Sequence, residues 1–127
     1  MSEHMQIGEV ARRIELSVRT VRHWDEVGLV TPSARSSGGF RLYTDDDVAR
    51  LLLVRRMKPL EFTLAEMAEV LAASDTLTAG TGDLEAAAAV ITAFRERADE
   101  RCETLRKRLA YAEEFTELLA RLESPSA

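Results

Sequence analysis

The sequence has few residues of the kinds that bind metals or form disulfides. It contains one cysteine, Cys102, and two histidines, His4 and His23, in 127 residues. A single cysteine cannot form a disulfide within the chain, which is typical of a reducing compartment. Thiolate or imidazole metal sites need several convergent ligands, and both histidines lie far from Cys102 in sequence. We therefore expect no metal and no organic cofactor.

Long apolar runs are also missing. No run approaches the ~18 consecutive apolar residues that a membrane helix needs. The first six residues contain neither a basic segment nor the apolar stretch of a secretory signal. These absences predict a cytoplasmic protein without a membrane partner. The chain carries no phosphate-binding loop, no dinucleotide-binding glycine motif, no zinc-protease motif and no nucleophile elbow, so we do not expect an enzyme.

The net charge of −5 looks unfavourable for binding nucleic acid, but the charges are unevenly distributed. Between residues 12 and 41 there are six arginines and three acidic residues. From residue 75 onward there are seven basic and eleven acidic residues. A ligand experiences the charges within about 8–10 Å more strongly than the total. A basic front and an acidic rear therefore indicate a protein that presents one face to phosphates.

The first thirty residues predict a helix-turn-helix. Ile7–Ile14 has apolar residues at helical spacing, and Ser17 is a good N-cap for a second helix that extends from Val18 to about Val27. Gly28 follows as the expected end of that helix. Two short helices joined by about three residues are the signature of this motif.

A small hairpin and two further helices are predicted next. Residues 30–43 read as a hairpin, or wing, with a tight turn at Ser36–Gly39. Thr44 and three following aspartates indicate a helix start, and Pro59 closes that helix. Thr63 and Glu66 form a capping box that opens a fourth helix through Leu71. Residues 1–74 are thus predicted to be one winged helix-turn-helix domain.

The rest of the chain predicts a linker and one long helix. Residues 75–82 are small and glycine-containing and read as a linker, residues 83–123 as one helix about 60 Å long, and residues 124–127 as a tail. A seven-residue apolar period is typical of a coiled-coil seam, and no second long helix is predicted, so we expect a homodimer in a mostly α fold. The predicted dimerisation residues are Leu84, Ile91, Ala98, Leu105, Leu109, Ala112 and Leu119.

The second helix carries the predicted function. Its outward positions include Arg19, Thr20, Arg22 and His23. Arginine can pair bidentately with guanine, threonine can contact a thymine methyl group or a phosphate, and histidine or Trp24 can donate to phosphate oxygens. The alternative is a solvated helix face with two arginines. The position of the second helix, after a capped turn and before a glycine-rich wing, favours DNA binding.

Four segments resemble the MerR family of bacterial transcription regulators. They are Ile7–Ala11, Ser17–Arg22, Val27–Pro32 and Gly39–Tyr43, and the resemblance covers about residues 5–73. It implies antiparallel dimers that bind pseudo-palindromic promoter sites, distort an overlong spacer and work with RNA polymerase in the nucleoid. It also implies roles for the wing and for the end of the third helix. The resulting DNA-binding set is Ser17, Arg19, Thr20, Arg22, His23, Trp24, Arg41, Tyr43 and Lys58.

The sequence departs from the family pattern at three places. His23 and Trp24 stand where the family commonly has two tyrosines, which alters the expected phosphate contact. Glu61 stands where glycine is usual, and a left-handed conformation there would cost ~1 kcal/mol. We also expect neither a separate ligand domain after the long helix nor the clustered cysteines of the family's metal and redox sensors.

Other interpretations stay open. An excisionase-type architectural protein would have the same winged helix-turn-helix domain, but it does not need a forty-residue dimerisation helix. A protein-interaction dimer that has lost DNA binding is disfavoured by the intact arginine set. Cys102 is best explained as a small buried apolar residue, and the alternative is a disulfide with its dimer mate, which needs the two Cα atoms within ~7 Å.

Overall fold

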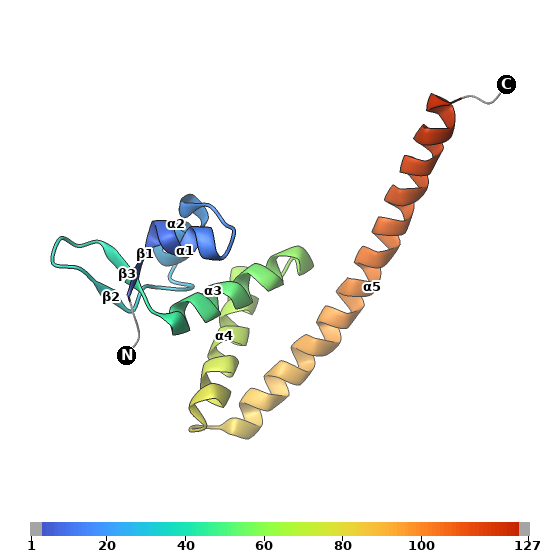
Figure 1. The fold of residues 1–127 in the computed structure, drawn as a ribbon. Helices are drawn as coiled ribbons and strands as arrows, with labels where there is room; N and C mark the ends of the chain where they lie inside the picture. Colours follow the sequence, from blue (N-terminus) through green and yellow to red (C-terminus); the bar gives the residue numbers. More distant parts are fainter. Residues whose placement is uncertain (1–3, 125–127) are drawn as a thin grey trace.

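The computed structural model describes residues 4–124, in which a small head carries one long helix (Figure 1). The predicted tail lies outside the described residues from residue 125 onward, as does the start of the N-terminus. The elements in chain order are β1 Met5–Gln6, α1 Ile7–Arg13, α2 Val18–Glu26, β2 Ala34–Arg35, β3 Arg41–Tyr43, α3 Asp45–Met57, the 3-10 helix η1 Lys58–Leu60, α4 Leu64–Ala79 and α5 Leu84–Glu123. The mostly α fold with a small β wing is confirmed.

The helix-turn-helix consists of α1 and α2. Ser17 caps α2 as predicted, because its Oγ accepts a hydrogen bond from the backbone N–H of Thr20 at 3.1 Å. Val21 and Trp24 on the inner side of α2 are buried, which fixes the helix on the head. The turn before α2 places Glu15 at φ 56°, a left-handed conformation that the sequence did not signal.

The wing is part of a three-stranded antiparallel sheet with the order β1-β3-β2. The hairpin of β2 and β3 was predicted, with Arg35 opposite Arg41. Strand β1 was not predicted, because two residues cannot show an alternating pattern. It pairs Met5 with Tyr43 and so ties the N-terminal segment to the wing.

Helix α3 begins as predicted at Thr44. The Thr44 hydroxyl accepts from the backbone N–H of Asp47, and the Asp47 carboxylate accepts from the N–H of Thr44. Asp47 is buried and also accepts from both the backbone N–H and the hydroxyl of Ser33, at 2.9 and 2.7 Å. This one carboxylate therefore joins the start of α3 to Ser33, the residue directly before β2.

Helix α4 is longer than predicted. Thr63 and Glu66 form the expected capping box, but the helix continues through Ala79 and ends at Gly80, which has φ 71°. The prediction of a linker over 75–82 is therefore wrong for residues 75–79. The threonines and the alanine of this segment were read as linker residues, yet both residue types are tolerated in a helix.

Helix α5 folds back along α4, and only its first half packs on the head (Figure 1). Ala87 and Phe94 are buried, and Ile91 and Ala98 are partly buried against the core. Two of the predicted dimerisation residues, Ile91 and Ala98, are therefore already partly covered within one protomer. Within residues 4–124, no helix is long and apolar enough to cross a membrane.

Candidate nucleic-acid interface

The outward side of α2 carries most of the predicted DNA-binding residues. Arg19, Arg22 and His23 are exposed on it. They line a shallow hollow of about 550 Å³ between α2 and η1. The full lining is Arg19, Thr20, Arg22, His23, Trp24, Glu26 and Lys58. Three arginine or lysine side chains against one glutamate make this surface suited to phosphate and to the acceptor atoms of guanine.

Ser17 and Thr20 are joined to each other at the start of α2. Their hydroxyl oxygens lie 2.9 Å apart in a hydrogen bond, and Ser17 Oγ also accepts from the Thr20 backbone. This bonding orients both hydroxyls at the helix N-terminus, where backbone N–H groups favour an anion. Ser17 and Thr20, both in the predicted DNA-binding set, therefore lie together at the N-terminus of α2.

Lys58 and Trp24 form one unit rather than two independent contacts. The indole of Trp24 is buried at 4% exposure, and the Lys58 ammonium lies 5.6 Å from the centre of its ring. The tryptophan therefore positions the lysine through a cation–π interaction. Trp24 therefore fills the core beneath α2 and also borders the hollow, and its donation to a phosphate oxygen stays a prediction.

The wing is fixed to α2 by a carboxylate that the sequence analysis did not single out. Asp25 accepts from Arg41 Nε at 2.5 Å and from Arg35 Nη2 at 3.4 Å. This pairing raises the pKa of the Arg41 guanidinium, chiefly through the hydrogen bond. The Arg41 side chain is 23% exposed, so it is partly committed within the protein, whereas that of Arg35 is 51% exposed.

Tyr43 does not lie at the DNA-facing surface. Its side chain is fully buried in the head, and its hydroxyl has no hydrogen-bond partner among residues 4–124. Burial, followed by the nearby Asp25 charge, raises the pKa of this phenol. The prediction that Tyr43 contacts DNA is therefore wrong. Tyr43 occupies the inward side of β3, where strand alternation places it against α1 and α3.

Two wing features were missed by the sequence analysis. Phe40 is 66% exposed and immediately precedes Arg41, the first residue of β3. Arg35 lies on the adjacent strand and donates to the carbonyl of Gly39 at 3.2 Å. An exposed aromatic ring next to arginines is a usable contact surface for the sugar-phosphate backbone. The glycine-rich turn was recognised, but its neighbours were read only as strand formers.

Across residues 4–124 the structure holds no group of three or more His, Cys, Asp or Glu side chains suited to a metal ion. Cys102 is half-buried on α5. The charged side chains that line the hollow beside α2 are instead three basic residues and one acidic residue, Glu26. They match an anionic polymer.

Comparison with known proteins identifies the family of this interface. The model for the MerR HTH family of regulatory proteins matches residues 5–74, from β1 into α4. The chain belongs to the MerR family. Its members are DNA-binding transcription regulators rather than enzymes, and the fold and the recognition surface above agree with that role.

Two relatives extend the match beyond the MerR head. The chain is 31% identical to the uncharacterized HTH-type transcriptional regulator PA4778 of Pseudomonas aeruginosa over 83% of its own length and 80% of that protein's. It is 34% identical to the HTH-type transcriptional regulator CueR of Yersinia pestis, over 87% and 80% of the two chains. It spans 63% of the length of two further relatives. The alignments with PA4778 and CueR thus take in part of α5.

One solved MerR structure has the same overall fold. HiNmlR, a MerR family regulator lacking the sensor domain and bound to promoter DNA, superposes with a TM-score of 0.51. The alignment covers 91% of this chain and 95% of that one, at 21% sequence identity. The likeness concerns the fold, including the long helix after the head.

Proposed function

We propose that this MerR-family regulator works as a homodimer on pseudo-palindromic promoter sites in the nucleoid. The observation that carries the proposal is the basic hollow along α2, in which Arg19, Arg22 and Lys58 converge. A helix whose outer residues are arginine, threonine and histidine fits the major groove. The wing would follow the phosphate backbone beside it.

The uncovered half of α5 supports the homodimer. Beyond the head, Leu109, Phe115 and Leu119 are 59%, 60% and 48% exposed. Removing apolar surface from water is favourable by about 25 cal/mol per Å². A row of large exposed apolar side chains along one helix therefore favours a partner that covers it. The predicted seam residues Leu109, Ala112 and Leu119 lie on this surface, and Leu105 lies half-buried at its start.

Distortion of the promoter spacer and contact with RNA polymerase are the finer parts of the proposal. Two heads held at a fixed separation can bind a site of the wrong length only by bending or untwisting it. Part of the binding free energy is then used to deform the DNA. HiNmlR is a MerR protein bound to promoter DNA, which supports this class of target. The helix α5 is the part that would set the separation.

The experiment is selection of binding sites from random duplexes, followed by footprinting and transcription with purified RNA polymerase. We expect an inverted repeat, two protomers per site, and output that depends on the spacer length between promoter hexamers. A selected site without symmetry, or binding by one protomer, would reject the dimeric regulator. Symmetric bending without any effect on transcription would favour the architectural role.

A further inference from the structure

His23 is the one side chain lining the hollow along α2 whose type changes charge near neutral pH. It is exposed and stands among Arg19, Arg22 and Lys58, with Glu26 as the one acidic residue of the lining. Between about pH 5.5 and 7.5, arginine and lysine stay protonated and glutamate stays ionised, whereas histidine exchanges its proton. The charge of the hollow therefore depends on pH through this one residue.

The charged neighbours of His23 come from two elements. On α2, Arg19 lies four residues before it, Arg22 directly precedes it and Glu26 lies three residues after it. Across the hollow, Lys58 belongs to η1. Within residues 4–124 none of these five side chains takes part in an ion pair. A ligand that neutralises the three cations therefore also favours a fourth positive charge beside them.

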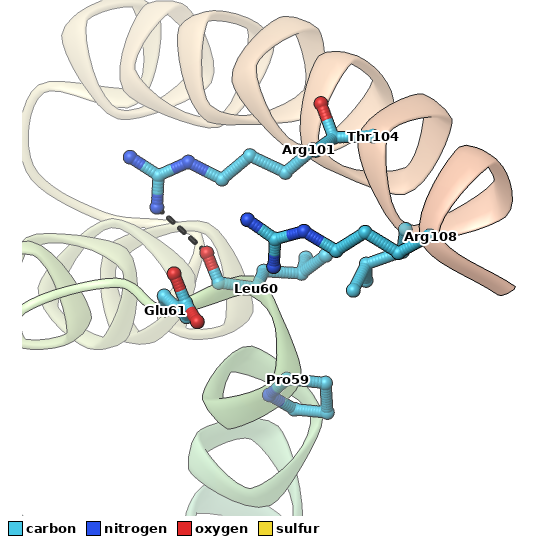
Figure 2. Close-up of a pocket in the computed structure, with 7 residues that line it drawn as sticks. Pro59, Leu60, Glu61, Arg101, Thr104 and Arg108 are labelled. Atoms are coloured by element: carbon cyan, nitrogen blue, oxygen red, sulfur yellow. Dashed lines mark hydrogen bonds between the residues drawn. The ribbon is translucent and has the colours of Figure 1, made fainter. Parts of the chain in front are cut away.

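Lys58 is held in place from two sides. Its ammonium lies 5.6 Å from the centre of the Trp24 ring. At the other end of η1, the Leu60 carbonyl accepts from Arg101 of α5 at 2.8 Å, beside a cavity of about 210 Å³ that is lined in part by Glu61 (Figure 2). The short helix η1 is thus tied to both α2 and α5. The positive charge that η1 presents to the end of α2 therefore has a defined position.

The place of His23 on α2 favours a phosphate rather than a base as its contact. In helix-turn-helix proteins the first residues of the recognition helix reach the base edges. Arg19 is the second residue of α2, whereas His23 lies in its last turn, where the helix dipole stabilises a cation. A protonated imidazole donates from both nitrogens and carries a full charge. Its hydrogen bond to a phosphate oxygen is therefore stronger than that of the neutral ring.

We propose that His23 takes up a proton when the hollow binds DNA, so that the affinity for DNA rises as the pH falls from about 7.5 to 5.5. The bound state favours the protonated ring because a phosphate then lies beside it and the neighbouring cations are neutralised. Because the bound state holds more protons than the free protein, binding is favoured at lower pH. The proposal rests on the DNA-binding function proposed above and adds a response to pH.

The response is a property of this chain and not of the family pattern. His23 stands where the family commonly has a tyrosine. A tyrosine hydroxyl titrates near pH 10 and would donate to a phosphate equally well at any pH between about 5.5 and 7.5. Replacing it by histidine makes the same contact depend on a proton.

Titration of the selected duplex between about pH 5.5 and 7.5, at constant ionic strength, measures the effect. We expect the dissociation constant to fall about threefold per protomer at the lower pH, as for an exposed ion pair, and hence about tenfold for two protomers on one site. Calorimetry in buffers of different ionisation enthalpy should report uptake of about 0.3 proton per protomer at the midpoint. Random duplex should show the same dependence, because every sequence presents phosphates.

Two substitutions at this exposed position separate the charge from the side chain. His23→Gln keeps a neutral donor and should bind with the same affinity throughout the pH range. His23→Lys carries a permanent charge and should bind at the upper pH about as tightly as the wild type binds at the lower pH. His4→Gln removes the chain's other histidine, which does not line the hollow, and is the matched control that should keep the full response.

The outcomes separate this inference from the function on which it rests. An affinity that is constant with pH, or a response that persists in His23→Gln, overturns the inference and leaves DNA binding standing. A response on the selected duplex but not on random duplex would place His23 against a base and overturn the phosphate contact. Failure to select any duplex at any pH would overturn the proposed function itself.

Discussion

Arg41 Nε lies 2.5 Å from Asp25 Oδ2, so a carboxylate on the recognition helix holds an arginine of the wing. An acidic residue among phosphate-facing arginines weakens the local positive potential. The geometry explains its presence, because Asp25 also accepts from Arg35 and thus joins α2 to both wing strands. The side chains of Asp25 and Arg41 are 10% and 23% exposed, so solvent screens the pair only partly.

Asp25→Ala should therefore affect the shape of the interface as well as its charge. We expect the free energy of unfolding to fall by about 1–2 kcal/mol, because Arg41 loses a partner in a half-buried place. The two released arginines should then bind phosphates, which steepens the salt dependence of binding by up to roughly two phosphate contacts. Denaturant unfolding and titrations at several salt concentrations measure the two effects.

Glu26→Ala is the matched control, since it removes one negative charge from the same helix. If both variants steepen the salt dependence equally, Asp25 acts only through its negative charge and does not hold the wing on α2. Discrimination between the selected site and random duplex should fall in Asp25→Ala alone, because a mobile wing no longer fixes the orientation of α2.

Arg19 and Lys58 should have separable roles. Arg19→Ala is expected to cost about 1–3 kcal/mol on the selected site and to relax the base preference at one position. Lys58→Ala should weaken binding to every duplex and flatten the salt slope by about 0.9, the share of one phosphate. Competition with single-base variants of the site distinguishes the two. Equal losses on all sequences for both variants would contradict this division.

Tyr43→Phe should stabilise the head. The hydroxyl of Tyr43 is buried without a partner within residues 4–124, so its removal should raise the free energy of unfolding by about 1 kcal/mol. The pKa of Tyr43 is raised in the folded protein. Its contribution to stability is therefore complete below the ordinary value of about 10 and is lost as the pH rises above it.

The phenylalanine variant should lack this loss of stability above pH 10, whereas Tyr111→Phe, at a position 67% exposed, should retain it. Thermal unfolding between pH 7 and 11 measures both. DNA affinity should be unchanged in Tyr43→Phe. A large loss of affinity would instead restore the sequence-based expectation that this hydroxyl contacts DNA.

The helices and their caps were predictable because their signals are local. Ser17, Thr44 and Thr63 cap helices through bonds to a residue three positions later, which a sequence displays directly. The end of α4 was missed because alanine and threonine are compatible with both helix and linker. Gly80, the residue that does end the helix, is one of two glycines in that stretch.

The candidate site was predictable in its positions and less so in its geometry. The outward face of α2 follows from helical spacing, so Arg19 and Arg22 were placed correctly. Tyr43 was misplaced because burial depends on contacts between distant segments, such as the pairing of β1 with β3. The Asp25–Arg41 pair is sixteen residues apart and has no sequence signal beyond opposite charge.

Glu61 provides a prediction about backbone strain. It follows η1 with φ 59° and ψ 35°, the left-handed conformation that the sequence comparison with the family anticipated. A side chain in this region costs about 1 kcal/mol relative to glycine. Glu61→Gly should therefore raise the free energy of unfolding, although part of the gain is offset by the greater flexibility of glycine in the unfolded chain.

We expect a net increase of about 0.5–1 kcal/mol for Glu61→Gly, measured by denaturant unfolding at constant protein concentration. Glu15→Gly, at φ 56° in the turn before α2, should behave in the same way. Glu113→Gly is the opposing control, because glycine inside α5 should destabilise the helix by about 1 kcal/mol. If Glu61→Gly is destabilising while Glu15→Gly is not, the carboxylate of Glu61 contributes a contact in the cavity beside Arg101 that outweighs the strain.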